Sequence, residues 1–257
     1  GNLIFQPLLG FLSGNQWSLA SIGFCVSAVL MPVVGLYVIS KNGGSLESMT
    51  GDIHKNFAKF LLLFIMIFAG NISVPRTGAV AYELGFKALL PNTPIIVFIL
   101  GYFAIALYFS LDVNKMVNSV GKFLTPVLVV VLLGIIIKGI LTPIGHPVVP
   151  QKSGVFTHSL LEGYQTGDLI VSYLIGTVFI GDIIRRGYRT SGERNKLTAY
   201  CGIIALILLA VIYVGLIYLG ASVSSYYPED VERSQLLLGI AERVLGKGGM
   251  LFFSIAV

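Results

Sequence analysis

The chain has 257 residues, of which 55% are hydrophobic and 11% are charged, and its mean hydropathy is +0.87. Soluble domains carry about 25% charged residues, so this composition excludes an ordinary water-soluble protein. The net charge of +5 would suit a nucleic-acid-binding protein, but the basic residues lie in short connections between apolar runs and not on one amphipathic face. The composition therefore predicts an integral membrane protein.

Six long apolar runs follow one another, and they span residues 16–40, 57–74, 94–111, 122–141, 164–183 and 198–222. Each is near or above the roughly 20 residues that cross the hydrocarbon core of a bilayer as a helix. Transmembrane strands alternate polar and apolar residues, whereas 61–68 and 127–137 are apolar at every position. We therefore predict an all-α membrane fold. Cys25 and Cys201 lie inside apolar runs and predict no disulfide.

Two partial apolar runs lie at the ends, over residues 3–13 and 250–257. The chain begins without an initiator Met, and it shows no signal-peptide pattern. We therefore expect both ends to be truncated, with Gly1 lying inside a first helix. The expected unit is one partial transmembrane domain over 1–257, from the second half of helix one to the start of helix eight.

The orientation is predicted from the distribution of Lys and Arg. Ten basic residues occur in the 44 positions of the connections 41–59, 112–122 and 184–197. Seven occur in the 69 positions of the opposite connections, 76–93, 138–162 and 223–248. The first set is therefore predicted to be cytoplasmic, in a multi-pass protein of the cytoplasmic membrane.

A polar segment bracketed by glycines interrupts the start of the run 164–183, where the chain reads Gly163, Tyr164, Gln165, Thr166, Gly167 and Asp168. An unpaired backbone group in hydrocarbon costs several kcal/mol, so such a segment persists only where protein or a bound solute satisfies it. Gly1 and Asn2 open the first partial run, five spans earlier. Five-helix units repeated with inverted topology place two discontinuous helices at the membrane midplane. The spacing therefore predicts discontinuous helices one and six around a solute site.

Three segments carry a family resemblance: 1–7, the Pro75, Arg76, Thr77 step with Glu83 and Gly85 downstream, and 163–168. In their order and placement they resemble the bacterial branched-chain amino acid:cation symporters. The resemblance implies the inverted-repeat transporter fold. It also implies a secondary active symporter that couples inward movement of Na⁺ or H⁺ to uptake of leucine, isoleucine or valine, with no cofactor beyond the coupling ion.

The expected site residues follow from their chemistry. Gly1 and Asn2 offer oxygen ligands for Na⁺. The backbone N–H groups of 163–166, together with the Thr166 hydroxyl, suit a substrate carboxylate. Phe5 and Tyr164 are candidates for the apolar wall, and Gln165 lies in the same interrupted segment.

Asp168 is an ionisable residue inside a span and is interpreted as a ligand for Na⁺, H⁺ or the substrate amine. The alternative is that it caps a helix that starts at Leu169. Asp182, at the cytoplasmic end of the same span, has the spacing to pair with Arg185 or Arg186. Ser172 is expected to bond back to its own helix.

Three other functions remain open: a symporter of another small amphipathic solute, an ion channel, or a membrane-embedded enzyme. A channel should show a polar stripe along several helices, and spans two to five lack one. An enzyme should show a nucleophile, base or metal motif, and none is recognisable in the sequence.

Overall fold

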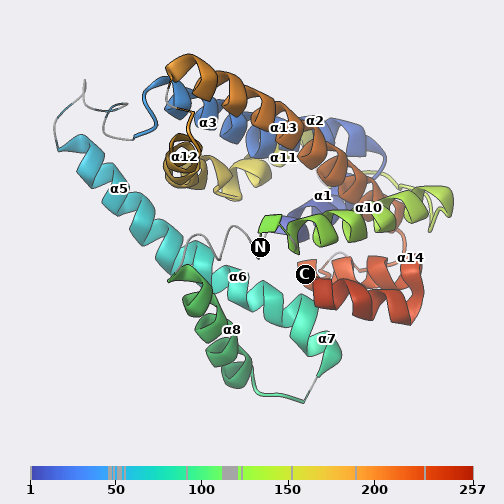
Figure 1. Ribbon diagram of the computed structural model, residues 1–257. Coiled ribbons are helices and arrows are strands. Elements are labelled where there is room, and N and C mark those ends of the chain that lie inside the picture. The colour runs from blue at the N-terminus through green and yellow to red at the C-terminus, as the bar shows by residue number, and fades with distance from the viewer. Residues whose placement is uncertain are drawn as a thin grey trace. The chain divides into compact units, whose positions relative to one another are not determined.

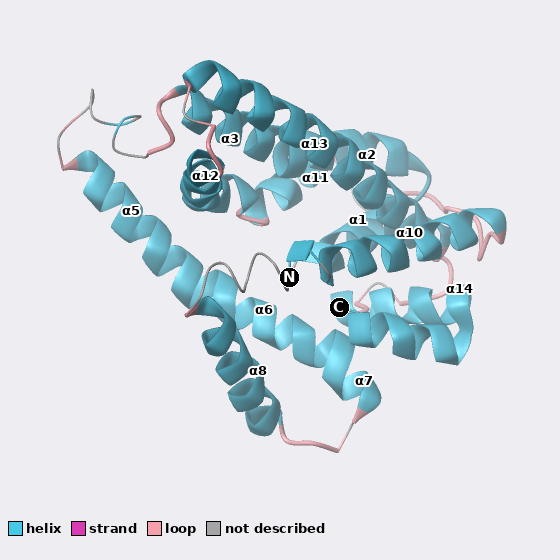
Figure 2. Cartoon of the chain, viewed as in Figure 1, coloured by secondary structure: helices cyan, strands magenta, loops and turns pink. Residues whose placement is uncertain are grey.

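The computed structural model describes residues 2–45, 48, 50, 54, 56–90, 92–111, 121–122, 124–151, 153–188, 190–228 and 230–256. Every regular element among these residues is a helix, which confirms the predicted all-helical class (Figure 2). The chain divides into two compact units. The first comprises Gly1–Trp17, Ser73–Gln151 and Gly215–Val257, and the second comprises Ser18–Ile72 and Lys152–Val214.

The first unit is built from short and medium helices (Figure 1). They are η1 (Asn2–Ile4), α1 (Phe5–Ser13), η2 (Gly14–Gln16), α6 (Val74–Ala81), η5 (Tyr82–Phe86), α7 (Lys87–Leu89), α8 (Ile95–Ser110), α10 (Thr125–Leu141) and α14 (Arg233–Ala256). The end of α13 (Ser191–Ser222) also belongs to this unit. Helices α1, α10 and η5 all pack against α14, so this helix is the centre of the unit.

The second unit holds most of α2 (Trp17–Cys25) and the first part of α13, together with five further elements. These are η3 (Val26–Leu30), α3 (Met31–Lys41), α5 (Phe57–Phe68), α11 (Val155–Gln165) and α12 (Asp168–Arg185), with η4 (Ala69–Ser73) at the boundary. Helix α12 packs along α3, and α11 packs on η3. Ile39, Ile180 and Ile183 form a buried cluster where α12 meets α3. This packing positions the interrupted segment between α11 and α12.

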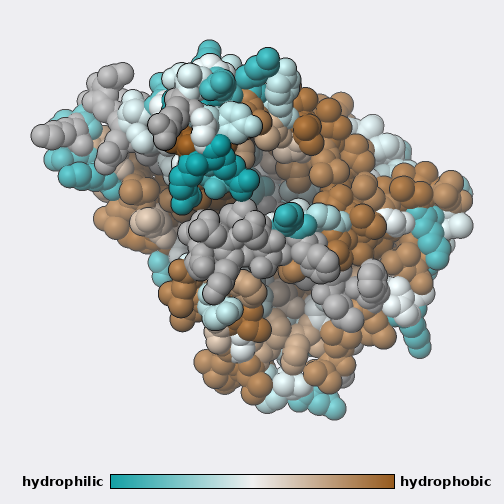
Figure 3. Space-filling view, in the orientation of Figure 1, coloured by the Kyte–Doolittle hydropathy of each residue, from teal (hydrophilic) through white to brown (hydrophobic). Residues whose placement is uncertain are grey.

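Four stretches of helix are long and apolar enough to cross a membrane: Phe5–Lys41, Phe57–Phe86, Val155–Arg185 and Ser191–Ser222. Two shorter apolar helices, Ile95–Ser110 and Thr125–Leu141, accompany them. Helix α8 buries none of its side chains inside the protein, and Leu100 is 68% exposed. Apolar residues also cover large areas of the face in Figure 3. Exposed apolar side chains on this scale suit contact with lipid, so the chain is a multi-pass membrane protein.

The C-terminal part of the chain differs from the sequence-based prediction. Residues 223–248 were expected to be a connection, but a helix begins at Arg233 and continues to Ala256. Its first half buries Leu236, Leu237 and Ile240 while Glu242 and Arg243 stay exposed. This is an amphipathic pattern, which a search for long apolar runs does not detect. Gly246 interrupts the helix with φ 74° and ψ 176°.

Two π-helical turns each precede a proline. Element η3 ends two residues before Pro32, and η4 ends two residues before Pro75. A proline lacks the N–H that an α-helix needs, and its ring clashes with the carbonyl four residues earlier. That carbonyl belongs to Ala28 in η3 and to Asn71 in η4. The wider π turn at both places is therefore explained by the proline that follows it.

In the first unit, α1 crosses the end of α13 at very close range. A methyl group added at Gly220 would overlap the Pro7 carbonyl, and one added at Gly10 would overlap the Ile217 carbonyl. Small residues let membrane helices approach until their backbones touch. Gly10 and Gly220 therefore set the separation of these two helices.

The orientation can be tested with single cysteines in a background where Cys25 and Cys201 are replaced by Ser. We expect Tyr188→Cys to react with an impermeant maleimide only after the cells are opened. Val149→Cys should react in intact cells. Both side chains are exposed, at 42% and 76%, so accessibility within the protein does not limit the reaction. The reverse labelling pattern would show that the predicted orientation is wrong.

Candidate functional site

Helix α11 ends at Gln165 and α12 begins at Asp168, and of the two residues between them Thr166 keeps helical dihedral angles while Gly167 does not. Gly167 has φ 76°, a left-handed conformation that glycine adopts without a steric penalty. The interruption is narrower than the predicted segment 163–168, because 163–165 form the last turn of α11. It lies inside the candidate span Val155–Arg185. Two helix ends therefore meet at Thr166 and Gly167 within one candidate span.

Thr166 stabilises this interruption through local hydrogen bonds. Its hydroxyl donates to the Gly163 carbonyl at 2.7 Å and accepts a weak bond from the Asp168 N–H at 3.4 Å. The backbone N–H of Gly167 donates to the Tyr164 carbonyl at 3.2 Å. Thr166 thus closes the end of α11 and touches the start of α12.

The structure places most of the expected carboxylate donors inside helix α11. The N–H groups of 163–165 lie in α11, where an α-helical N–H donates to the carbonyl four residues earlier. The first N–H groups of a helix lack such partners, and in α12 the first residues are Asp168, Leu169 and Ile170. The N–H groups without a helical partner therefore lie at the start of α12 and not at 163–165.

Gly163 has a packing role in addition to its place beside the interruption. It is buried, and a methyl group there would collide with the Ser27 hydroxyl and approach the Phe24 carbonyl at 2.9 Å. Ser27 donates to the Gly23 and Phe24 carbonyls, both at 3.3 Å. Gly163 therefore lets α11 pack closely on α2 and η3. The side chains of Tyr164 and Gln165 are exposed.

Asp168 lies in the first turn of α12 and is partly buried. The residue that precedes the helix is Gly167, so the alternative in which Asp168 caps a helix starting at Leu169 is wrong. A carboxylate in the first turn is favoured by the positive end of the helix dipole. Asp168 lies within electrostatic range of Tyr213 of α13.

Tyr213 was missed by the sequence analysis. Its ring is 6% exposed and meets the Phe24 ring edge-on, with the ring centroids 5.5 Å apart. A tyrosine within an apolar span gives no pattern that separates a site residue from a packing residue, so only the fold places it near Asp168.

Two smaller predictions on α12 are confirmed. Ser172 donates to the Leu169 carbonyl of its own helix at 2.7 Å. Arg186 Nε lies 2.7 Å from Asp182 Oδ2, which is the expected ion pair. The guanidinium side chain is 60% exposed, so solvent screens the pair and its contribution to stability is about 0–1 kcal/mol.

In the first unit, Gly1 lies outside the described residues, and Asn2 begins the short helix η1. Phe5 follows as the first residue of α1 and is 3% exposed. The Arg76 and Arg233 guanidiniums lie 4.3 and 4.5 Å from its ring centroid. Cation–π contacts of this kind contribute about 0.5–2 kcal/mol each. Phe5 therefore joins α6 and the start of α14 to the start of α1.

The apolar helices and the interruption within a span define a multi-pass helical membrane protein. Comparison with protein families matches residues 1–257 to the family described as "Branched-chain amino acid transport protein", and the chain belongs to this family. The match confirms the resemblance noted from the sequence. The relatives are transport permeases and not enzymes.

The relatives include the branched-chain amino acid permease BrnQ of Haemophilus influenzae, 31% identical over 97% of the chain and 59% of the relative. The BrnQ permease of Bacillus subtilis is 32% identical over 86% of the chain and 52% of the relative. The BraB permease of the same organism is 29% identical over 100% of the chain and 60% of the relative. The chain thus spans somewhat more than half the length of these relatives. No solved structure matches it significantly.

Proposed function

We propose that the chain forms part of a secondary active symporter that takes up branched-chain amino acids across the cytoplasmic membrane. The observation that carries this proposal is the family match over 1–257, together with relatives whose printed names are those of branched-chain amino acid permeases. Coupling to Na⁺ or H⁺ and the inverted-repeat architecture belong to the same proposal.

The geometry around Thr166 and Gly167 supports a binding role. The start of α12 presents backbone N–H groups that suit a substrate carboxylate, and the end of α11 presents carbonyls that suit an ammonium. Asp168 adds a negative charge at this point. A charged side chain inside a span is costly, and such residues therefore usually mark a binding site or an ion pathway. Asn2, with Gly1, stays a candidate Na⁺ ligand, and Phe5 and Tyr164 stay candidates for the apolar wall.

The proposal is tested by counterflow of labelled leucine in vesicles that contain the natural full-length protein, with Na⁺ and pH gradients varied separately. We expect leucine exchange, competition by isoleucine and valine, and accumulation driven by one of the two gradients. Conduction of ions without substrate would favour the channel alternative. Accumulation of a different solute that leucine does not inhibit would favour another substrate on the same fold.

A further inference from the structure

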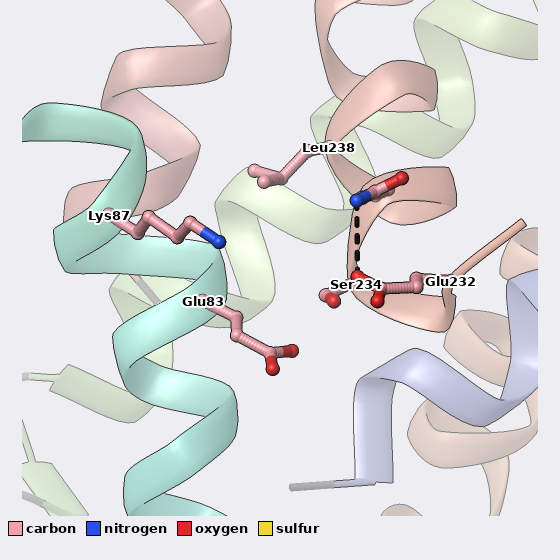
Figure 4. A pocket seen from close by; sticks show the side chains of 6 residues that line it. Glu83, Lys87, Glu232, Ser234 and Leu238 are labelled. Atoms are coloured by element: carbon pink, nitrogen blue, oxygen red, sulfur yellow. Dashed lines mark hydrogen bonds between the residues drawn. The ribbon is translucent and has the colours of Figure 1, made fainter. Parts of the chain in front are cut away.

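A cavity of about 220 Å³ lies in the first unit. It is lined by Glu83, Lys87, Glu232, Ser234, Gln235 and Leu238. Figure 4 shows Glu83 and Lys87 extending from one side toward Glu232, Ser234 and Leu238 on the other. The cavity thus combines two carboxylates, one ammonium and one aliphatic side chain.

The arrangement of Glu83 and Lys87 follows from the π-helix η5. A Glu four residues before a Lys is the favourable order for an ion pair on an α-helix. Here residues 82–86 form a wider π turn, which changes the angular offset between the two side chains. Among the described residues, no hydrogen bond or ion pair joins Glu83 to Lys87. Both charges are therefore left facing the cavity.

The opposite wall is organised by the start of α14. Gln235 Nε2 donates to Glu232 Oε2 at 3.1 Å, which orients this carboxylate (Figure 4). Ser234 is 5% exposed, and Leu238 supplies apolar surface one turn further on. This wall therefore offers the Glu232 carboxylate, held by a hydrogen bond from Gln235, beside the aliphatic surface of Leu238.

We propose that this cavity is an outer binding site for an α-amino acid zwitterion with an aliphatic side chain, where the solute binds before it reaches the site proposed at Thr166 and Gly167. Glu83 and Glu232 hold the ammonium, Lys87 holds the carboxylate, and Leu238 contacts the side chain. Both walls come from stretches, 76–93 and 223–248, that the charge distribution predicts to be outside. The inference rests on the proposed function, because it assigns a second site to the same class of substrate.

The test uses Gln235→Cys in the full-length protein with Cys25 and Cys201 replaced by Ser. Labelling with an impermeant maleimide is measured in intact cells with leucine, 3-methylbutylamine or 4-methylpentanoate, of which the last two lack the carboxylate or the ammonium. At a leucine concentration about ten times its dissociation constant, occupancy should slow labelling by about tenfold. The amine and the acid should give no protection at the same concentration.

Substrate binding at Thr166 and Gly167 would also change the accessibility of position 235 if it altered the conformation of the protein, so variants separate the two causes. Lys87→Gln and Glu83→Gln should each remove the protection, whereas Lys247→Gln and Glu242→Gln should keep it, because neither residue lines the cavity. Protection that survives Lys87→Gln and Glu83→Gln would overturn the proposal, as would protection by the amine alone. Absence of protection in a protein that still exchanges leucine would overturn it as well, and absence of exchange would instead contradict the proposed function.

Discussion

Replacement of Asp168 with Asn is expected to lower cation-driven accumulation of leucine by about tenfold or more, as the loss of about 1.4 kcal/mol of coupling free energy would. Asn keeps the size of the side chain and its place in the first turn of α12, but it removes the negative charge. Accumulation ratios in vesicles with imposed Na⁺ or pH gradients measure the effect.

The control is Asp182→Asn on the same helix. That carboxylate pairs with Arg186 at the far end of α12, and the variant should keep its accumulation ratio. Leucine counterflow, which needs no gradient, shows whether Asp168→Asn still binds substrate. An accumulation ratio equal to that of the unmodified protein would leave Asp168 with a structural role at the helix start.

Substitution of Gly220 with Ala should destabilise the first unit by about 1–3 kcal/mol, and Val should cost more. The reason is the contact between α1 and the end of α13, where the Pro7 carbonyl occupies the space that a methyl group would need. The two helices must separate to admit it. Thermal unfolding of the detergent-solubilised protein, followed by size-exclusion chromatography, measures the loss.

Gly134→Ala in α10 is the matched control, because no neighbouring atom lies within 4 Å of its added methyl group. Alanine has a higher helix propensity than glycine, so this control should unfold at the same temperature as the unmodified protein or at a slightly higher one. A melting temperature for Gly220→Ala equal to that of the control would show that α1 and α13 are not in close contact in the membrane protein.

The helical class was predictable because hydrocarbon permits few structures and long apolar runs are easy to recognise. The interruption was also visible, since Gly163, Thr166 and Gly167 stand out in an apolar run. The width of the interruption could not be predicted, because Gly163, Tyr164 and Gln165 stay helical when α11 packs on η3. Glycine is compatible both with an unwound segment and with a close helix contact.

Other parts of the candidate site depend on contacts distant in sequence. Phe5 was expected in an apolar wall, and its sequence neighbours give no sign that Arg76 and Arg233 lie against its ring. The same holds for Tyr213, which the fold brings into electrostatic range of Asp168. The helix that begins at Arg233 was missed for a different reason, because its amphipathic pattern is weaker than a transmembrane run. Pairs that the fold brings together from separate helices cannot be derived from local patterns.

The π turn η3 also constrains how related sequences can differ. A π turn accommodates one residue more than an α turn, so the extra residue is absorbed locally and the positions on either side keep their faces. Deletion of one residue within Val26–Leu30, with an α turn restored, would therefore leave Ile39 in its cluster with Ile180. The restored α turn would bring the ring of Pro32 against the carbonyl four residues earlier. Alignments of relatives should therefore show a single-residue gap here only where Pro32 is replaced as well.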